Sequence, residues 1–399
     1  MSADAAPSIY VVAPGGRSAT GGMCRMVDYT MAEWEAAGRL PRMRLVDSTG
    51  PYIKWRQPFH FASALGRVLT DGLRGRIALL HIHAAERGSV LRKALFIHLA
   101  DLLGVPSVIH MHAAGFEAFY GRAPGFVRRA VTRAFRKASR FIVLGGETAR
   151  YFVETVGLDR DRVAVVRNAV PDPDATLGAL SGTLSGTAWR EPHAVCHLAF
   201  VGALIERKGL AELIAALAHP QMPDQRWHLN IAGNGDPAPW RKLAEQHGVA
   251  DRVTFHGWLD SAGVQRLLAV SDALVLPSWA EGLPMVVIEA MAHGLPVVCT
   301  PVGAVREAVE DGATGLLVPP GDPASLAHAL ARLVRSPALR RRLGQAGRQR
   351  YVAEFGIVRL NDRLEGVFAE ALHGRRPAIP ATARGTPAGV PALVERSEA

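Results

Sequence analysis

Short apolar runs alternate with amphipathic stretches of helical length along the first half of this 399-residue chain. The run Ser8–Ala13 (SIYVVA) is followed by a glycine-rich loop and an amphipathic stretch over Met23–Ala37. Further apolar runs at Ala78–His83 and Val105–His112 flank a helical pattern over Ser89–Leu103. Strands that are joined by helices of this length pair in parallel, so the alternation predicts a βαβ sheet.

The same alternation starts again after a polar stretch, rich in Gly, Ser, Thr and Pro, over Pro171–Pro192. The predicted strands of this second series are His197–Val201, His228–Ala232, Val253–Phe255, Ala273–Leu276, Val297–Cys299 and Gly315–Val318. The predicted helices between them are Lys208–Ala218, Pro239–His247, Ser261–Val270 and Met285–His293. We therefore predict an α/β chain of two Rossmann-like, doubly wound parallel-sheet domains, over residues 1–178 and 193–357. Ligands of open parallel sheets bind beyond the carboxyl ends of the strands, which puts the predicted site in the cleft where the two domains face each other.

Composition narrows the setting in which such a chain works. The three cysteines, Cys24, Cys196 and Cys299, lie far apart, which argues against a disulfide framework. Neither a signal peptide nor a run of about 18 uncharged apolar residues is visible, so we expect a soluble, cytoplasmic protein. Residues 374–399 are rich in Ala, Pro, Gly and Arg, and we expect this tail to be disordered.

The formal net charge is +10, and nearly all of it lies before residue 179. Residues 1–178 hold 24 Lys and Arg against 15 Asp and Glu, whereas the rest of the chain holds 22 against 21. A partner that attracts cations should therefore meet the N-terminal half. Nucleic acid, an anionic membrane and a phosphorylated substrate are the candidates. We predict no nucleic-acid partner, because no aromatic platform or known binding module accompanies the charge.

The most specific motif lies over residues 278–297 and carries two glutamates, Glu281 and Glu289. A strand is predicted to end at about Leu276 and a helix to start near Pro284, since proline is favoured at a first helical position. The start of such a helix suits a phosphate or diphosphate, because its N–H groups are free and its dipole is positive there. The carboxylate of Glu281, in the loop, can accept hydrogen bonds from sugar hydroxyls, and Glu289, further along, can reach a ribose diol. The alternative is a helix start with an acidic residue near its N-terminus and an ordinary surface glutamate.

With this segment the chain resembles family 4 of the glycosyltransferases, retaining enzymes of the GT-B fold whose signature is two glutamates separated by seven residues. Other matching segments are Phe200–Gly209, Ile231–Asp236, Phe255–Leu259 and Gly312–Asp322, and the resemblance covers roughly residues 8–370. It implies that Glu281 holds hydroxyls of the donor sugar and that Glu289 holds the ribose. Backbone around residues 257–259 would line the base pocket. The donor-binding residues expected in this part of the chain are Gly257, Trp258, Leu259, Gly282, Leu283, Pro284 and Glu289.

Arg207 and Lys208 follow the first strand of the second series. Cations at this place can neutralise the charge that builds on a departing nucleoside diphosphate. Lys208 matches the lysine of the family, but Ala203 stands where the family usually has an arginine. Arg207 or another basic residue would then supply the missing cation. The alternative is that both are solvated loop residues.

The loop after the first strand carries Gly21 and Gly22, which allow the backbone to approach a phosphate closely. By itself a glycine-rich loop is a weak signal. Both glycines match the loop of the family that contacts the acceptor and the phosphate, so we expect them to bind the donor.

Two of the predicted strands end in His-x-His, at His81–His83 and His110–His112. At strand spacing the members of each pair share a face, so the four imidazoles could converge as a metal site. No carboxylate or cysteine ligand accompanies them, so we predict that they bind no metal. We interpret His81 and His110 as polar residues that cap the ends of the strands. His112 matches the histidine of the family that lies near the donor sugar.

Two basic segments of the N-terminal half could meet an anionic partner. The stretch Phe126–Arg140 has a helical period, and its cations from Arg128 to Arg140 favour contact with anionic lipid headgroups, at about 1 kcal/mol per cation near the surface. A solvated domain helix is the alternative. Arg87 and Ser89 follow the strand that ends at His83, and we expect them to bind a phosphate of the acceptor, although a helix-capping Ser89 explains the pattern too.

The resemblance implies a retaining, metal-independent hexosyltransferase without a cofactor, with His112, Lys208 and Glu281 as catalytic residues. It would move a hexose from a nucleoside-diphosphate sugar to a sugar or lipid-linked acceptor, in exopolysaccharide or glycolipid biosynthesis, at the inner face of the cytoplasmic membrane. The helix over residues 358–373 would pack back on the N-terminal domain. The alternatives are a sugar-nucleotide epimerase of the same fold, which needs no acceptor, and a non-catalytic protein that binds anionic membranes.

Overall fold

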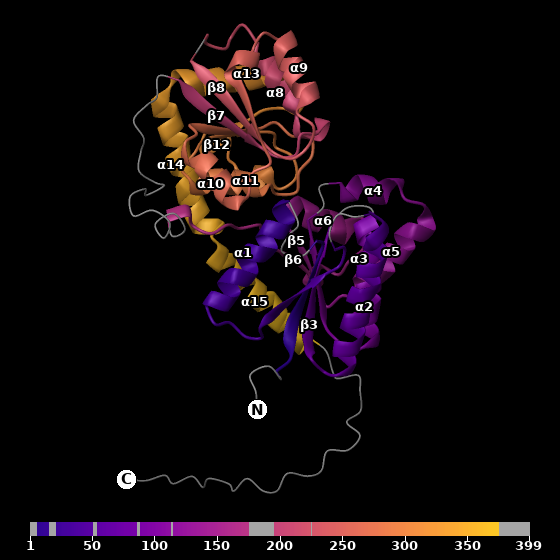
Figure 1. Ribbon diagram of the computed structural model, residues 1–399. Coiled ribbons are helices and arrows are strands. Elements are labelled where there is room, and N and C mark those ends of the chain that lie inside the picture. The colour runs from indigo at the N-terminus through magenta and orange to yellow at the C-terminus, as the bar shows by residue number, and fades with distance from the viewer. Residues whose placement is uncertain are drawn as a thin grey trace, which may run out of the picture.

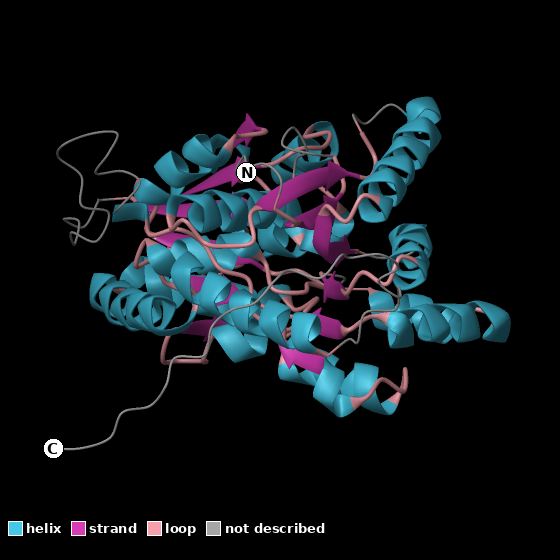
Figure 2. Ribbon diagram, turned by 90° about the horizontal axis from the view of Figure 1, so that it is seen from below, coloured by secondary structure: helices cyan, strands magenta, loops and turns pink. Residues whose placement is uncertain are grey.

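Two six-stranded sheets, in which all strand pairs are parallel, form the two lobes of the molecule (Figure 1). The computed structural model describes residues 6–15, 21–50, 54–85, 88–112, 115–174, 195–224 and 226–374. We call the lobe that contains the sheet of β1–β6 the N-terminal lobe, and the lobe that contains β7–β12 the C-terminal lobe. Figure 2 shows that helices surround the strands, so each sheet is covered on its faces.

The N-terminal sheet has the strand order β2-β1-β3-β4-β5-β6. Its strands are β1 (Ser8–Ala13), β2 (Met43–Asp47), β3 (Ile77–Ala84), β4 (Ser107–Met111), β5 (Arg140–Val143) and β6 (Val163–Val165). Its helices are α1 (Gly22–Ala36), α2 (Gln57–Leu73), α3 (Gly88–Leu102), α4 (Phe116–Arg122), α5 (Gly125–Lys137) and α6 (Gly146–Glu154). Helices α2, α3 and α5 pack on one face, and α1 packs on the other with the last helix of the chain, α15 (Ile357–His373).

Strand β1 shows why these runs become central strands. Ile9 and Val11 are buried in the hydrophobic cluster on the α1 side, and Tyr10 and Val12 are buried in the cluster on the opposite face. Successive side chains of a strand point to opposite faces, so a run that is apolar at every position is stable where both faces are covered.

The C-terminal sheet has the strand order β12-β11-β10-β7-β8-β9. Its strands are β7 (Cys196–Val201), β8 (Trp227–Ala232), β9 (Val253–Gly257), β10 (Ala273–Leu276), β11 (Val297–Cys299) and β12 (Gly315–Leu317). Its helices are α8 (Leu210–Leu217), α9 (Ala238–Gln246), α10 (Ser261–Ala269), α11 (Met285–Ala292), α12 (Val305–Ala308), α13 (Pro323–Arg335) and α14 (Pro337–Glu354). The strand order reverses between β7 and β10 here and between β1 and β3 in the other sheet, and such reversals open a crevice at the carboxyl ends of the strands.

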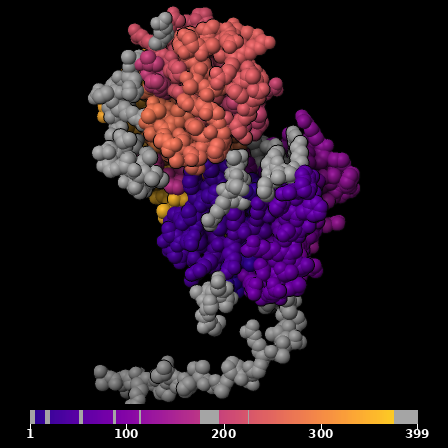
Figure 3. Space-filling view, viewed as in Figure 1, coloured from indigo at the N-terminus to yellow at the C-terminus, as the bar shows by residue number. Residues whose placement is uncertain are grey.

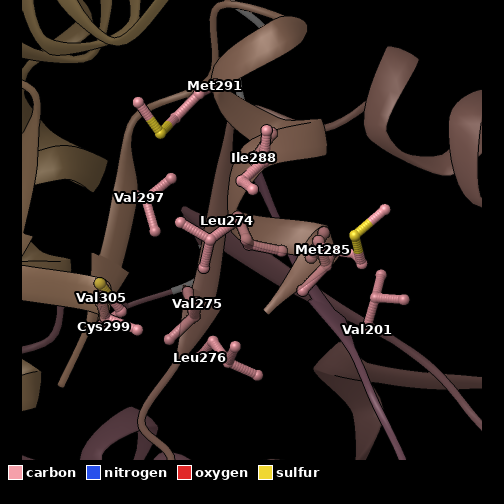
Figure 4. Close-up of a cluster of buried hydrophobic side chains, with 14 of the residues drawn as sticks. Val201, Leu274, Val275, Leu276, Met285, Ile288, Met291, Val297, Cys299 and Val305 are labelled. Atoms are coloured by element: carbon pink, nitrogen blue, oxygen red, sulfur yellow. The ribbon is translucent and has the colours of Figure 1, made fainter. Parts of the chain in front are cut away.

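The core of the C-terminal lobe fixes the elements on either side of the Glu281 loop. Every residue of β10 and of α11 is buried. Figure 4 shows Leu274 and Val275 of β10 in a cluster that includes Met285, Ile288 and Met291, all three from α11. The loop between these two elements is therefore held at both of its ends.

The chain returns to the N-terminal lobe after α14. Ile357 N–H donates to the carbonyl of Val170, 3.1 Å away, and Val170 N–H donates to the carbonyl of Phe355, so the two crossings between the lobes lie side by side. Helix α15 then packs along α1, where the rings of Trp34 and Phe368 lie 5.8 Å apart.

The structure confirms two doubly wound parallel sheets. Helix α8 starts at Leu210 and not at Lys208, because Gly209 adopts a left-handed φ of +73° and separates it from a 3-10 turn over Glu206–Lys208. The helix predicted over Phe126–Arg140 ends at Lys137, and Arg140 belongs to β5. Most of the predicted polar stretch and residues 375–399 of the predicted disordered tail lie outside the described residues. None of the described helices is long and apolar enough to cross a membrane.

Candidate functional site

A cleft of about 690 Å³ lies between the two lobes. Its walls come from the segments that follow β1, β4, β5 and β6 in the N-terminal lobe and β7, β8, β9 and β10 in the C-terminal lobe. The space-filling view shows the narrowing between the lobes where this cleft lies (Figure 3). Its volume falls within the range of small-molecule sites, and it contains the carboxyl-terminal ends of strands from both sheets.

Lys208 and Glu281 form an ion pair on the C-terminal wall of the cleft. The ammonium Nζ lies 2.5 Å from Oε1 of Glu281, and the two side chains are 14% and 9% exposed. The backbone fixes this pair, because Trp279 N–H donates to the carbonyl of Arg207 and so ties the two loops together. Gly209 is required beside them, since a Cβ there would lie 2.1 Å from the carbonyl oxygen of Pro277. The cleft thus presents a paired cation and carboxylate at the end of β10.

The backbone of Glu281 packs closely against Gly303, which follows β11. Gly303 has a φ of +56°, and a Cβ at this position would lie 2.0 Å from the carbonyl oxygen of Glu281. Ala304 N–H donates to the carbonyl of Gly282, which adds a hydrogen bond to the same loop. The position of the carboxylate therefore depends on a glycine that is distant in sequence.

Helix α11 begins after Pro284, which is its N-cap residue and not its first helical residue. Glu289 lies within this helix and is fully buried, and Arg25 of α1 approaches it from the other lobe, with Nη1 3.1 Å from Oε1. Burial raises the pKa of Glu289, and the charge of Arg25 opposes that rise. Arg25 lines the cleft, whereas the predicted donor residue Glu289 is not among the residues of the cleft wall.

Four histidines stack at the ends of β3 and β4. His83 Nδ1 lies 2.9 Å from Nε2 of His112, and the ring of His112 lies 4.2 Å from that of His110. His112 lines the cleft, whereas His81 and His110 lie beneath it. Burial lowers the pKa of all four imidazoles, to about 3 for His81 and His112, so the cluster is neutral at neutral pH.

One ring nitrogen from each of His81, His83 and His110 lies within 4.8 Å of the other two. The sequence allowed this convergence, and the structure brings these three together. No carboxylate is among the charges that act on them, and the cationic Lys93 acts on His83. A divalent cation without an anionic ligand is costly in a buried site, so a metal-free cluster stays our prediction.

Acidification is expected to destabilise the protein, because the lowered histidine pKa values mean that the unfolded chain binds protons first. The contribution of these histidines to stability is full above pH 6.5 and falls as the pH drops toward 3, by about 2 kcal/mol per histidine between pH 6.5 and 5. The variant His81→Leu should lose less of its Tm between pH 7.5 and 5 than the wild type. His98→Leu, at an exposed position of α3, is the control and should follow the wild type. Equal losses in all three would contradict this role of the cluster.

The other predicted donor residues lie at varied places. Those that line the cleft are Gly21, Gly22, Trp258, Leu259, Gly282, Leu283 and Pro284. Gly257 ends β9 with a φ of +71°. The guanidinium of Arg207 donates to the carbonyl of Ala280 at 2.5 Å, and this residue is not part of the cleft wall. Lys208 is thus the cation that this segment contributes to the cleft.

The predicted acceptor residues are described only in part. Arg87 lies outside the described residues. Ser89 lies in the first turn of α3, and its hydroxyl accepts a hydrogen bond from Ala85 N–H, 3.3 Å away. The hydroxyl thus bonds to the loop before the helix, and not to an N–H of the first helical turn as an N-cap side chain does.

Three polar residues that reach the cleft wall from the N-terminal lobe were missed from the sequence. Arg25 and Asp28 project from α1, and Asn168 donates from Nδ2 to the carbonyl of Leu283 in the opposite lobe, 2.6 Å away. Arg25 follows Gly21 by four residues, about one helical turn, and this spacing was the available signal.

Two family models match the chain, one for each lobe. The model described as glycosyl transferase 4-like domain matches residues 9–169, and the model described as glycosyl transferases group 1 matches residues 191–350. A glycogen synthase of Mycobacterium tuberculosis is 31% identical over 293 residues, which are 71% of this chain and 68% of that protein. A D-inositol 3-phosphate glycosyltransferase of Thermomonospora curvata is 32% identical over 334 residues, or 78% and 74% of the two chains.

Solved structures share the fold at lower identity. The structure of sucrose-phosphate synthase from Thermosynechococcus elongatus superposes with a TM-score of 0.75 at 22% identity, over 92% of this chain and 100% of that one. The structure of Anabaena HepE in complex with UDP gives a TM-score of 0.68 at 17% identity, over 91% and 99%.

Proposed function

Since this chain belongs to family 4 of the glycosyltransferases and has their GT-B fold, we propose that it is a retaining hexosyltransferase that uses a nucleoside-diphosphate sugar. The proposed acceptor is a sugar or a lipid-linked sugar, in exopolysaccharide or glycolipid biosynthesis. The observation that carries the proposal is the ion pair of Lys208 and Glu281 in the interdomain cleft, at the carboxyl ends of the strands. It offers a carboxylate to sugar hydroxyls and a cation to a phosphate, side by side.

Each part of the donor finds a suitable group in the C-terminal lobe. The carboxylate of Glu281 accepts from hydroxyls of the hexose, and the ammonium of Lys208 faces the diphosphate. The free N–H groups at the start of α11 add positive potential for the same phosphates. Trp258 and Leu259 line the end of the cleft where the base would lie.

In the proposed reaction the bond between the anomeric carbon and the diphosphate oxygen breaks, and the acceptor oxygen bonds to the same face of that carbon. The acceptor proton passes to the departing phosphate oxygen, so no protein base is needed. Lys208 stabilises the charge that grows on the leaving group. His112 remains neutral, because burial lowers its pKa to about 3, and it serves as a polar contact for the sugar at the cleft wall. With a cation and helix N–H groups in place, we propose that the enzyme needs no metal.

The test is glycosyl transfer from a panel of nucleotide sugars (UDP-glucose, UDP-galactose, GDP-mannose and ADP-glucose) to lipid-linked and free sugar acceptors. At least one donor should be consumed, and NMR of the product should show the anomeric configuration of the donor. The rate should not change in EDTA. The variant Glu281→Ala should stay folded and lose this activity, which would show that the measured transfer depends on the cleft. Inversion of the anomeric centre, or donor isomerisation without an acceptor, would contradict the proposal.

We further propose that the enzyme meets its acceptor at the inner face of the cytoplasmic membrane, through helix α5. The exposed residues of this helix include Arg128, Arg129 and Arg133, and the ring of Phe126 is 68% exposed beside them. The other three cations of the predicted basic stretch have partners within the protein. Arg136 donates to the carbonyl of Gly157, Lys137 pairs with Asp101, and Arg140 pairs with Glu370. Three arginines and one aromatic ring thus support this contact.

Vesicle flotation tests the membrane proposal. The protein should float with vesicles that contain phosphatidylglycerol and not with pure phosphatidylcholine vesicles. A variant with glutamate at positions 128, 129 and 133 should lose this binding and keep its activity toward water-soluble acceptors. Undiminished flotation of the variant would exclude α5 as the contact.

A further inference from the structure

Two cationic side chains, Arg25 and Lys208, line the cleft among the residues that the structure describes there. They come from different lobes, since Lys208 follows β7 and Arg25 lies on α1. Arg207 is bonded to the carbonyl of Ala280 and lies off the cleft wall. A diphosphate in the cleft would therefore have one cation from the C-terminal lobe and one from the N-terminal lobe.

Helix α1 is seated directly on the helix that carries Glu289. Gly22 contacts Met285 closely, so that a Cβ on Gly22 would lie 3.2 Å from Met285 Cγ. One turn further along, Arg25 Nη1 lies 3.1 Å from Oε1 of the fully buried Glu289. The side chain of Arg25 is 22% exposed, and the residue lines the cleft.

The contact between Arg25 and Glu289 is an ion pair without a well-directed hydrogen bond. Neither carboxylate oxygen of Glu289 has a hydrogen-bond partner within the described part of the chain, although both are buried. Such a carboxylate gains from any pair of O–H donors that reaches it, because an unsatisfied buried charge is costly. Two neighbouring hydroxyls of a ribose supply such a pair, and they would take the place of the guanidinium.

We propose that Arg25 is the second cation of the diphosphate site, held on Glu289 until the hydroxyls of the ribose replace it. This inference rests on the proposed nucleoside-diphosphate donor. The displaced guanidinium remains beside the cleft and turns to the phosphates, where two oxygens of one phosphate can accept from its planar fork of N–H donors. Since Arg25 belongs to the N-terminal lobe, the leaving group is fully neutralised only when the lobes are closed, which protects the donor from hydrolysis in an open cleft.

Calorimetric titration of the wild type and of Arg25→Gln tests this role. Each protein is titrated with a nucleoside diphosphate and with the matching nucleoside: UDP and uridine, GDP and guanosine, ADP and adenosine. The variant should bind the nucleoside diphosphate about 10–100-fold more weakly than the wild type, the range of one charge-assisted hydrogen bond. Its affinity for the nucleoside should be unchanged or higher, because Glu289 is no longer covered. Arg25→Lys should recover part of the loss, and it also serves if the glutamine variant does not fold. Arg266→Gln is the control, because Arg266 is exposed on α10 and its replacement removes the same positive charge.

The outcomes separate this inference from the donor assignment. If the wild type binds a diphosphate and Arg25→Gln binds it equally well or more tightly, Arg25 only covers Glu289 and the inference is overturned. An equal loss for the diphosphate and the nucleoside would also overturn it, since the effect would then not concern the phosphates. If the wild type binds none of the three diphosphates, the proposed donor class itself is wrong, and the inference goes with it.

Discussion

Replacement of Lys208 by methionine is expected to lower the rate of glycosyl transfer by about 10²–10³-fold, the usual cost of one preorganised charge at a transition state. The ammonium lies 2.5 Å from Glu281 in a cleft that leaves it only 14% exposed, so water cannot replace it well. Methionine keeps an apolar stem like that of Lys208, which lies beside Gly202. The effect should therefore appear in kcat at saturating donor, measured by release of the nucleoside diphosphate.

Lys242→Met is the matched control, because Lys242 is exposed on α9, away from the cleft. Its kcat should equal that of the wild type. A kcat of Lys208→Met within about threefold of the wild type would remove Lys208 from the reaction. A change in KM alone would mean that the lysine binds the donor equally in the ground and transition states.

Gly303→Ala is expected to reduce both stability and activity. The residue has a left-handed φ of +56°, which costs a non-glycine residue about 1–2 kcal/mol. The added Cβ would also lie 2.0 Å from the carbonyl oxygen of Glu281 and 2.6 Å from that of Gly282, so this loop must move. We expect a loss of about 2–5 kcal/mol in the free energy of unfolding, measured in urea, together with a clear fall in kcat.

Gly312→Ala separates the two causes. Gly312 has a similar φ of +71°, but a Cβ there has no atom within 4 Å. This variant should lose only the 1–2 kcal/mol of the backbone term and keep its activity. If both variants behave alike, the packing of Gly303 against the Glu281 loop does not position the carboxylate.

The central strands could be predicted because burial on both faces makes every residue apolar. Strands β1, β10 and β11 have the predicted bounds. The strands β2 and β6, in contrast, went unrecognised. Both lie at the edges of their sheet, where β6 is half-buried at each position and β2 at most of its positions, so neither shows a continuous apolar run. Helix α2, which begins at a Gln-Pro pair, was missed as well.

Residues of one lobe could be nominated from local motifs, but contacts between lobes could not. Glu281 and Lys208 were found because each lies in a short segment with a recognisable pattern, and the structure brings them together. Arg25 and Asn168 reach the cleft from the opposite lobe, and their partners are set by how the lobes meet. No periodicity or spacing along the chain encodes that meeting. The convergence of the histidines could be expected from the sequence, because the members of each His-x-His pair share a face of their strand. The register that places His83 beside His110 comes from the structure.

The position of α15 affects the order in which the two lobes complete their folding during synthesis. Domains generally fold as units during synthesis, N-terminal first. Here the layer that α1 begins on one face of the first sheet stays incomplete until residues 357–373 leave the ribosome, since Leu364 and Phe368 of α15 are buried against α1 and the sheet. Until then, the part of this apolar face that α15 covers is exposed, whereas the lobe built from residues 196–354 already has all of its elements. The second lobe can thus mature before the first, and a nascent chain stalled before residue 357 should need a chaperone on the earlier half.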